Sequence, residues 1–353
     1  MSASHEPLGS PPEPEFPGAA EWGPYRGTGE PHDGIDALPP PPPWRTFEGA
    51  PLIDQELGAD RTGARRLGAI DRARSYRADP QVVEMVNAAL LLRRPLLVTG
   101  KPGTGKSTLA YSIAYELRLG PVLSWSITSR SNLAEGLYRY DGIGRLQEAS
   151  LHQATAPADR PAVPDIGRYI HLGPLGTALL PRARPRVLLI DEMDKSDIDL
   201  PSDLLHVFEE GRYEIPELAR LPEDLDVVDV MAADSTERVP LRRGQVNCFA
   251  FPIVVVTSNN EREFPPAFLR RCIRLDIKPP DPERLASIVE AQLGPEVVAS
   301  SHALIQEFLE RREHGDLATD QLLNAIYIAT SGSQPVGKRI IDSLLRSLDP
   351  TGA

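Results

Sequence analysis

The sequence predicts an α/β protein in which helices cover both faces of a parallel β-sheet and a small all-helical domain follows the sheet. Two observations predict the sheet. Short apolar, β-prone runs recur between helical and polar segments, and the first run leads directly into a glycine-rich turn and a helix. The five runs are Leu96–Thr99, Pro121–Ile127, Val187–Ile190, Ile253–Thr257 and Ile273–Ile277. Continuous apolar runs of this length are typical of parallel strands buried between two layers of helices.

A third observation predicts where the sheet domain ends. Pro279, Pro280 and Pro282 follow the last run, and proline disrupts both strand ladders and helix interiors. Only helical patterns come after them, over residues 282–293, 296–312, 318–330 and 336–348. We therefore expect three parts, with boundaries at 1–60 for a tail, 61–278 for the sheet domain and 279–353 for a helical domain.

The first 60 residues have the composition of a segment without a core. Thirteen of the 36 prolines lie within residues 1–51, and five of them form the unbroken run Pro39–Pro43. Such a segment buries too little apolar surface to offset the entropy cost of ordering it, so we expect a disordered, partly polyproline-II tail. This tail is either a spacer or a docking segment, in which the proline run, Trp44, Arg45 and Phe47 contact a partner or the sheet domain.

Bulk composition argues against several classes of protein. With 353 residues, 41% of them apolar, the chain is long enough for a large domain plus a smaller one. A formal charge of −12 makes nucleic acid an unexpected partner. The two cysteines and seven scattered histidines indicate neither a disulfide framework nor a zinc site. Residues 1–10 lack signal-peptide features and no apolar stretch reaches the length of a membrane span, so we expect a cytoplasmic protein without membrane insertion.

The turn after the first predicted strand carries the pattern G-x-x-x-x-G-K-[ST] over Gly100–Ser107. Glycines at this spacing let successive backbone N–H groups surround phosphate oxygens, and the helix that begins at Lys106 adds its positive end. In this motif Lys106 reaches the β- and γ-phosphates and Ser107 ligates Mg²⁺. The expected nucleotide-binding residues are Gly100, Pro102, Gly103, Thr104, Gly105, Lys106, Ser107 and Thr108.

Two later strands end in polar side chains that suit hydrolysis of ATP. Asp191 and Glu192 follow the third run, and Asn259 follows the fourth, so all three lie at the carboxyl edge of the sheet beside the glycine-rich turn. We expect Asp191 to hold Mg²⁺, Glu192 to accept a proton from the attacking water, and Asn259 to bind that water or the γ-phosphate. The acidic residues that come next are expected to form a solvated loop and helix start: Asp194, Asp197, Asp199 and Asp203.

Taken in order, these motifs resemble an AAA+ ATPase of the MoxR or dynein-related branch of the P-loop nucleoside triphosphatases. The resemblance rests on the glycine-rich turn, the Asp-Glu and Thr-Ser-Asn strand ends, the segment Pro265–Arg271 and the helical patterns after it. It covers about residues 76–345. It implies an αβα core with a C-terminal helical lid, ATP and Mg²⁺ as ligands, and hydrolysis of ATP.

The resemblance also implies roles for single residues. Asn259 resembles sensor 1, and Arg271 resembles an arginine finger that acts on the nucleotide of a neighbouring subunit. Arg339 resembles sensor 2, which reaches the phosphates from the lid and so adds to the nucleotide-binding residues. Two alternatives stay open, because Arg270 is adjacent to the finger position and Lys338 is adjacent to the sensor 2 position.

The function that the resemblance implies is an ATP-driven remodeller or activator of a protein client, similar to the MoxR-like chaperones. Such proteins are homo-oligomers, with a hexameric ring as the expectation, and relatives commonly act with partners that carry a von Willebrand factor A domain. Inserts near residues 129–144 and 212–251 match places where relatives face the pore or the substrate. In the second insert, Tyr213–Ile215 and Val239–Leu241 predict a hairpin.

Two other functions stay open. One is an ATP-gated switch or scaffold with little turnover, in a bacterial signalling or conflict system. The other is a phosphotransferase that uses the same glycine-rich turn, although Glu192 and Asn259 suit water better as the acceptor of the phosphoryl group.

Overall fold

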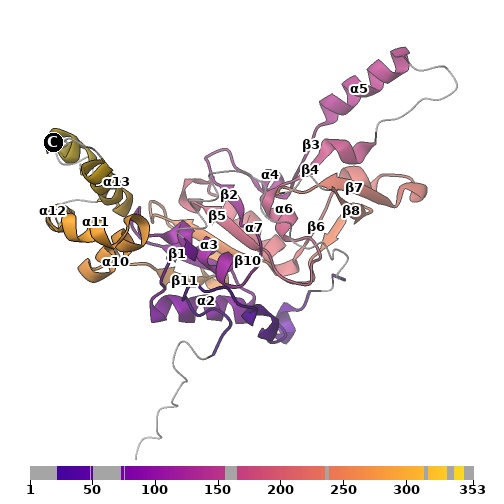
Figure 1. The fold of residues 1–353 in the computed structure, drawn as a ribbon. Helices are drawn as coiled ribbons and strands as arrows, with labels where there is room; N and C mark the ends of the chain where they lie inside the picture. The colour runs from indigo at the N-terminus through magenta and orange to yellow at the C-terminus, as the bar shows by residue number, and fades with distance from the viewer. Residues whose placement is uncertain are drawn as a thin grey trace, which may run out of the picture.

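The computed structural model describes residues 22–47, 49–50, 73–74, 76–155, 165–234, 238–313, 317–331 and 338–345. At its centre is a five-stranded sheet of order β11-β1-β10-β5-β2, in which every neighbouring pair is parallel (Figure 1). The strands are β1 (Leu96–Thr99), β2 (Leu123–Ser126), β5 (Val187–Asp191), β10 (Ile253–Ser258) and β11 (Ile273–Asp276). Each predicted run forms one strand of this sheet, so the predicted α/β fold is confirmed.

Helices cover both faces of the sheet because its strands are apolar on both faces. Successive strand residues point to opposite sides, so Leu96 and Val98 join one buried cluster while Leu97 joins the other. The first cluster packs under α2 (Pro80–Leu92) and α3 (Lys106–Glu116). The second packs under α6 (Pro174–Ala178), α7 (Leu200–Glu210) and α9 (Pro266–Arg271).

Residues 22–47, which we call the N-terminal strap, pack against the sheet domain. Tyr25 is fully buried, its N–H donates to Asn87 Oδ1 at 2.9 Å, and Asn87 Nδ2 donates back to the Tyr25 carbonyl at 2.9 Å. The Tyr25 hydroxyl is hydrogen-bonded to Ser112 Oγ of α3 at 2.9 Å. The expectation of a disordered tail is therefore wrong for this segment, because buried polar groups of α2 and α3 satisfy its backbone and side chains. Residues 1–21, 48 and 51–60 of the predicted tail lie outside the described residues.

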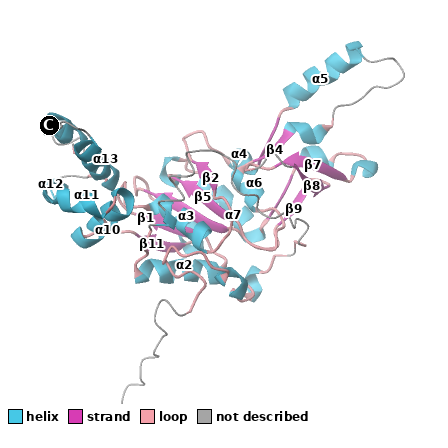
Figure 2. Ribbon diagram, in the orientation of Figure 1, coloured by secondary structure: helices cyan, strands magenta, loops and turns pink. Residues whose placement is uncertain are grey.

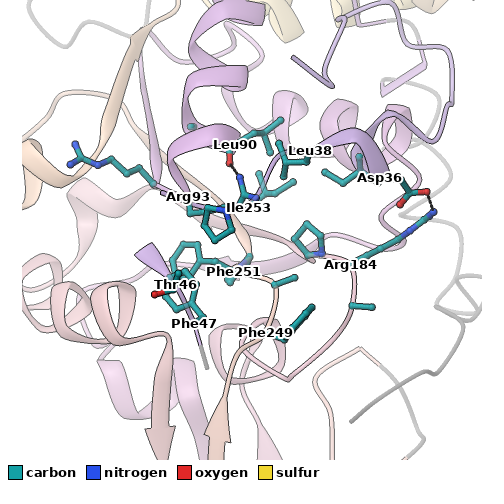
Figure 3. Close-up of a pocket in the computed structure, with 18 residues that line it drawn as sticks. Asp36, Leu38, Thr46, Phe47, Leu90, Arg93, Arg184, Phe249, Phe251 and Ile253 are labelled. Atoms are coloured by element: carbon teal, nitrogen blue, oxygen red, sulfur yellow. Dashed lines mark hydrogen bonds and ion pairs between the residues drawn. The ribbon is translucent and has the colours of Figure 1, made fainter. Parts of the chain in front are cut away.

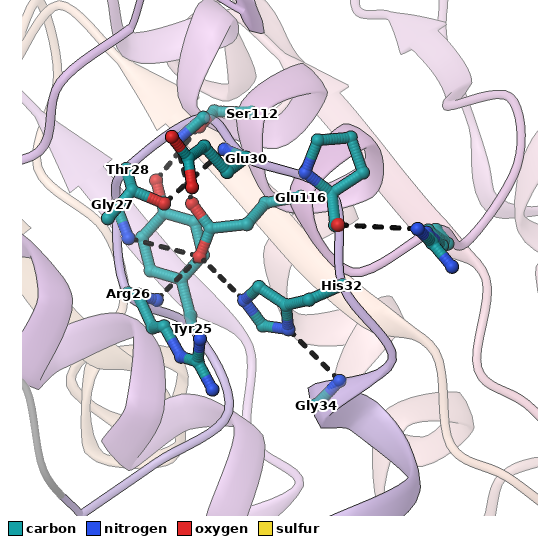
Figure 4. A network of polar contacts seen from close by, with 12 residues as sticks. Tyr25, Arg26, Gly27, Thr28, Glu30, His32, Gly34, Ser112 and Glu116 are labelled. Carbon is teal, nitrogen blue, oxygen red and sulfur yellow. Dashed lines mark hydrogen bonds and ion pairs between the residues drawn. The ribbon is translucent and has the colours of Figure 1, made fainter.

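A buried carboxylate of α3 organises the first half of the strap (Figure 4). Glu116 is fully buried and accepts backbone N–H groups from Arg26 at 2.6 Å, Gly27 at 3.1 Å and Gly29 at 3.0 Å. His32 Nε2 lies 3.4 Å from Glu116 Oε1 on the same side. A charged group can be buried only when such partners replace water, so this network explains why the strap follows a fixed path along α3.

The second half of the strap crosses the amino edge of the sheet, opposite to the glycine-rich turn. There it lines a pocket of about 400 Å³ together with the end of α2 and the segments that lead into β5 and β10 (Figure 3). The Phe47 ring stacks on the Phe251 ring with their centroids 4.9 Å apart. The Arg45 guanidinium lies 5.2 Å and 4.9 Å from the two ring centroids. The docking role that the sequence left open for Arg45 and Phe47 is thus seen within this chain.

The inserts build a second sheet beside the central one. Its order is β3-β4-β7-β8, and a separate two-stranded sheet pairs β6 with β9. The strands are β3 (Tyr138–Tyr140), β4 (Ile170–Leu172), β6 (Arg212–Glu214), β7 (Val227–Met231), β8 (Arg238–Arg242) and β9 (Gln245–Asn247). The predicted hairpin is wrong, because Tyr213 pairs with Val246 while β8 pairs with β7. The prediction overlooked β7, whose alternating Val228 and Val230 are buried and give β8 a nearer partner.

Short helices complete this region, and one longer helix extends from it. The helix α5 (Gly142–Thr155) projects away from the rest of the molecule (Figure 1). The remaining short elements are η1 (Gly34–Ala37), η2 (Pro43–Arg45), α4 (Leu133–Leu137), η3 (Ile166–Tyr169), η4 (Met193–Lys195), α8 (Pro216–Ala219) and η5 (Glu223–Leu225). In the described parts of the chain, none of the helices combines the length and the apolar character of a bilayer span.

The described residues after the sheet are helical, as predicted (Figure 2). The helices are α10 (Pro282–Leu293), α11 (Pro295–Ser300), α12 (His302–Glu313), α13 (Thr319–Ser331) and α14 (Lys338–Leu344). They share a buried cluster of their own. The predicted helix at 296–312 is two helices, which meet at the buried Ser301. An ion pair between Arg284 of α10 and Asp79 ties this helical region to the start of α2.

Candidate nucleotide site

The carboxyl ends of three neighbouring strands bring the predicted site residues to one edge of the sheet. The strand β10 lies between β1 and β5, with Thr99 level with Ser258 and Val256 level with Ile190. The residues that follow these positions therefore leave the sheet side by side. This shared register is what places the glycine-rich turn, Asp191 and Asn259 together, although they are far apart in the sequence.

The glycine-rich turn joins β1 to α3 and needs glycine where the backbone is crowded. Gly100 has a φ of 145°, and a Cβ there would lie 2.4 Å from the Ile277 carbonyl oxygen. Gly103 has a φ of 74°, and a Cβ there would lie 2.7 Å from the Cβ of Ala318 in the helical region. The turn is thus held between the end of β11 and the segment that enters α13.

Lys106, the first residue of α3, directs its ammonium group back into the turn. Its Nζ donates to the carbonyl oxygens of Gly100 at 2.7 Å and Lys101 at 2.8 Å, and the side chain is buried. Burial lowers the pKa of Lys106, and the nearby carboxylates of Asp194 and Asp191 oppose that shift. Among the described residues, the hydrogen-bond partners of this buried cation are neutral carbonyl groups. A cation of this kind, in a loop at a helix N-terminus, has the chemistry to bind a phosphate chain.

Two hydroxyl groups hold the carboxylate of Asp191. Ser107 Oγ and Thr257 Oγ1 each donate to Asp191 Oδ1 at 2.7 Å. The Thr257 hydroxyl also accepts the N–H of Glu192 at 2.9 Å, so it links β10 to the end of β5. Hydroxyl and carboxylate oxygens are the ligands that Mg²⁺ prefers, so the pair of Ser107 and Asp191 can hold a divalent cation. The sequence did not single out Thr257, because a Thr at the end of a strand carries no local signal for this contact.

Glu192 stands in an unusual backbone conformation next to Asp191. Its φ of 60° and ψ of 50° lie in the left-handed region, which costs energy for a residue with a Cβ and is concentrated at functional sites. Its side chain is half exposed, and Oε2 accepts from Lys195 Nζ at 2.8 Å.

Asp194 differs from its predicted place in a solvated loop. It is buried, and its Oδ2 accepts the backbone N–H groups of Asn259 at 2.8 Å and Glu261 at 3.2 Å. Its Oδ1 is also buried, with no hydrogen-bond partner among the described residues. The prediction failed because Asp194 is buried as the acceptor that fixes the loop after β10, and it thereby positions Asn259. The Asn259 Nδ2 atom donates to Glu261 Oε1 at 3.4 Å.

Of the remaining predicted residues, some belong to the glycine-rich turn and to α3, whereas Arg271 and Arg339 lie on other helices. Thr104 Oγ1 donates to the Lys101 carbonyl within the turn at 2.9 Å, and Pro102 and Thr108 belong to the turn and to α3. Arg271 ends α9 and forms an ion pair with Glu209 of α7. Arg339 is exposed on α14, and its described contacts include none with the turn.

Tyr76 is a further residue of the site that sequence reasoning missed. A Cβ at Gly105 would lie 3.6 Å from the Tyr76 ring, and burial raises the pKa of the Tyr76 hydroxyl. The guanidinium group of Arg284, in the helical region, donates to the carbonyl oxygen of Arg77, the residue after Tyr76. No spacing or composition signal marks Tyr76, because its role depends on the turn and the helical region meeting there.

The fold and this set of side chains define a P-loop nucleotide-binding domain. A family model described as AAA domain (dynein-related subfamily) matches residues 95–272, from the start of β1 to the end of α9. The match spans half of the chain, and the protein belongs to this family of AAA ATPases. The resemblance drawn from the sequence is thereby confirmed. No curated protein matches the chain.

Proposed function

We propose that the protein is a MoxR-like AAA+ ATPase that binds Mg-ATP and uses its hydrolysis to remodel or activate a protein client. The observation that carries this proposal is the grouping of three features at one edge of the sheet: Lys106 directed into the turn, the hydrogen-bonded pair of Ser107 and Asp191, and the adjacent Glu192. A phosphate-binding turn without an acidic residue beside it would support binding only. The adjacent pair of carboxylates supports hydrolysis.

Each residue of the site has a role in this proposal. The backbone of Gly100–Gly105 and the Lys106 ammonium bind the phosphates, and Ser107 and Asp191 hold Mg²⁺, which neutralises charge on the phosphates when it is bound. Glu192 accepts the proton of the attacking water. Asn259, fixed by Asp194, orients that water or the γ-phosphate.

Two further parts of the proposal concern the assembly and the moving parts. We assign the helical region at 279–353 as a lid whose movement against the sheet domain transmits hydrolysis, because Ala318 contacts the turn at Gly103. Arg271 acts on the nucleotide of a neighbouring subunit in a homo-oligomeric, hexameric ring. The client is a protein, and one with a von Willebrand factor A domain is the first to test. Arg339, exposed on α14, reaches the phosphates only after a movement of the lid.

The proposal is tested by pairing nucleotide binding with phosphate release. Lys106→Ala is expected to abolish binding of a fluorescent ATP analogue, because the phosphates lose the buried ammonium group that is directed into the turn. Glu192→Gln is expected to keep binding and to stop phosphate release, because an amide cannot accept the proton. Arg242→Ala, an exposed residue of the second sheet, is the matched control for loss of a surface charge. Unchanged binding in Lys106→Ala contradicts the nucleotide site itself.

One observation favours a second function, an ATP-gated switch with little turnover. Lys195 Nζ donates to Glu192 Oε2 at 2.8 Å in this structure, so the ammonium group occupies an oxygen that the attacking water would need. The same phosphate-release measurement separates the two functions. Steady release supports the remodeller, whereas ATP binding without release, with and without candidate clients, supports the switch.

A further inference from the structure

Arg271 is held within its own subunit by a single acidic residue. Its Nε donates to Glu209 Oε1, and this hydrogen bond raises the pKa of Arg271 and lowers the pKa of Glu209. The two side chains are 38% and 44% exposed, so the pair lies at the surface, where ion pairs are weak. A weak pair fixes the direction of a side chain and still releases it to a stronger anion.

Glu209 stands where a helix disfavours a negative charge. It is the penultimate residue of α7, and the C-terminal end of a helix carries a partial negative charge of its own. Glu210, the next residue, pairs instead with Arg212 at 2.9 Å. The two adjacent glutamates therefore have different partners, and only Glu209 engages the predicted arginine finger.

Arg45 of the strap anchors the same end of α7. Its NH1 donates to the carbonyl of Phe208 at 3.0 Å, the residue before Glu209, and its NH2 donates to the Arg93 carbonyl at 2.5 Å. Burial lowers the pKa of Arg45 most, followed by repulsion from Arg94, and the charge of Glu209 opposes this shift. Glu209 thus lies in the field of two arginines, one from the strap and one from α9.

We propose that Glu209 is a positioning residue that presents Arg271 to the neighbouring subunit's nucleotide, and that Arg45 fixes the helix end from which Glu209 acts. The inference rests on the proposed function, because it requires Arg271 to act in trans. The γ-phosphate of a neighbouring subunit carries more negative charge than one carboxylate, so it takes Arg271 from Glu209 when the ring assembles. Before that moment, Glu209 keeps the guanidinium from sampling other directions.

The test compares Glu209→Gln with Glu210→Gln in the full chain. Misplacing a catalytic group by about 1 Å costs up to about 100-fold, so Glu209→Gln is expected to lower kcat about 10- to 100-fold. KM for ATP, the affinity for a fluorescent ATP analogue and the assembly size by light scattering are expected to stay at the parent values. Glu210→Gln is expected to match the parent protein throughout. Equal kcat for the two variants overturns the inference.

A mixing experiment shows whether Glu209 acts through Arg271. Glu209→Gln subunits have an intact phosphate site, and Lys106→Ala subunits have an intact Arg271 and Glu209. Co-assembled, they are expected to regain hydrolysis, as are mixtures of Arg271→Ala with Lys106→Ala. Rescue of Arg271→Ala without rescue of Glu209→Gln overturns only the inference. Failure of both, in mixtures shown to co-assemble, overturns the trans action of Arg271 and the inference with it.

A readout independent of hydrolysis is the Nε–H signal of Arg271 in a ¹⁵N–¹H spectrum. The hydrogen bond to Glu209 is expected to shift this signal and slow its exchange with water. The shift is expected to decrease in Glu209→Gln, whose amide oxygen is a neutral and weaker acceptor, and to persist in Glu210→Gln. It is expected to weaken in Arg45→Met, which keeps most of the stacked side chain but loses its donors. An Arg271 signal that is identical in Glu209→Gln and the parent contradicts the ion pair.

Discussion

At the residue scale, the candidate site depends on side chains such as Thr257 and Asp194, which hold the predicted site residues in place. Thr257 holds Asp191 and the backbone of Glu192, and Asp194 holds the backbone of the loop that carries Asn259. In the proposed function, partners of this kind orient the groups that bind metal and water, and the loss of such a partner typically costs about 10- to 100-fold in metal affinity or activity. The left-handed Glu192 depends on the same support, because its N–H has the Thr257 hydroxyl as acceptor.

Thr257→Val is expected to weaken the binding of Mg²⁺ by removing the hydroxyl that aligns Asp191. The Mg²⁺ concentration for half-maximal rate should rise about 10- to 100-fold, as for other residues that orient a metal ligand. Thr257→Ser retains the hydroxyl and should behave as the parent protein. A magnesium titration of phosphate release checks both variants. Equal titrations for Val and Ser at this position would show that the hydroxyl has no role.

The two cysteines provide a prediction about reactivity. Cys248 and Cys272 are free and buried, and burial raises the pKa of each thiol to about 12. Because the thiolate is the reactive form, neither thiol should react with a disulfide reagent at pH 8 in the folded protein. Both should react in denaturant, where the pKa returns to about 8.5. Rapid labelling of one thiol in the native protein would show that its surroundings open.

At the scale of elements, the strap links parts of the domain that the chain does not connect directly. Its first half binds α2 and α3 through Asn87, Ser112 and Glu116, and its second half reaches the end of α7 through Arg45. The helix α3 begins at Lys106, so the strap supports the same helix that carries the lysine predicted to bind phosphate. A Pro-rich composition did not prevent this docking, because the partners are buried polar groups of the sheet domain.

Truncation is expected to show that the strap is part of the folded domain. A protein that begins at residue 49 leaves Glu116 and Asn87 without their partners, and each lost hydrogen bond to a buried group costs about 1 kcal/mol or more. We expect its melting temperature to fall by about 5–10 °C. A protein that begins at Trp22 retains every strap contact described above and is the control. Thermal unfolding followed by circular dichroism makes the comparison, and equal melting temperatures would mean that the strap contributes nothing.

At the scale of the whole molecule, the proposed function requires the helical region and a neighbouring subunit to complete the site. The segment before α13 touches the turn at Gly103, while Arg339 of α14 is exposed. Arg271 differs from these residues because its proposed target lies in another subunit. Within its own chain it is paired with Glu209. In the proposed function, the groups that bind ATP belong to one chain, and Arg271 of the next subunit completes hydrolysis.

Arg271→Ala is therefore expected to leave ATP affinity nearly intact while hydrolysis falls by about 10³-fold or more, the usual effect of an arginine finger. Arg270→Ala tests the adjacent alternative, because Arg270 is exposed and its carbonyl, at 3.3 Å, accepts from Arg94. Phosphate release and binding of a fluorescent ATP analogue are measured on the assembled protein. A larger loss in Arg270→Ala than in Arg271→Ala would move the finger by one position.

The sequence by itself determined the α/β class, the five strands of the central sheet and the AAA family. These features are readable because each depends on residues adjacent in the chain: apolar runs predict strands, and the spacing of Gly100, Lys106 and Ser107 is the spacing that a phosphate chain requires. The P-loop residues and the strand-end Asp191, Glu192 and Asn259 were candidates on the same grounds, and their roles in binding and hydrolysis stay predictions.

Only the tertiary structure decided the path of the strap, the pairing of the insert strands and the partners of Asp194 and Arg271. Each of these depends on groups that are distant in sequence, as when Tyr25 bonds Asn87 62 residues away and Arg45 bonds Phe208 163 residues away. Composition and periodicity describe a segment by its own residues. They cannot reveal that a polar group elsewhere in the fold is buried and in need of a partner, and that need is what orders residues 22–47.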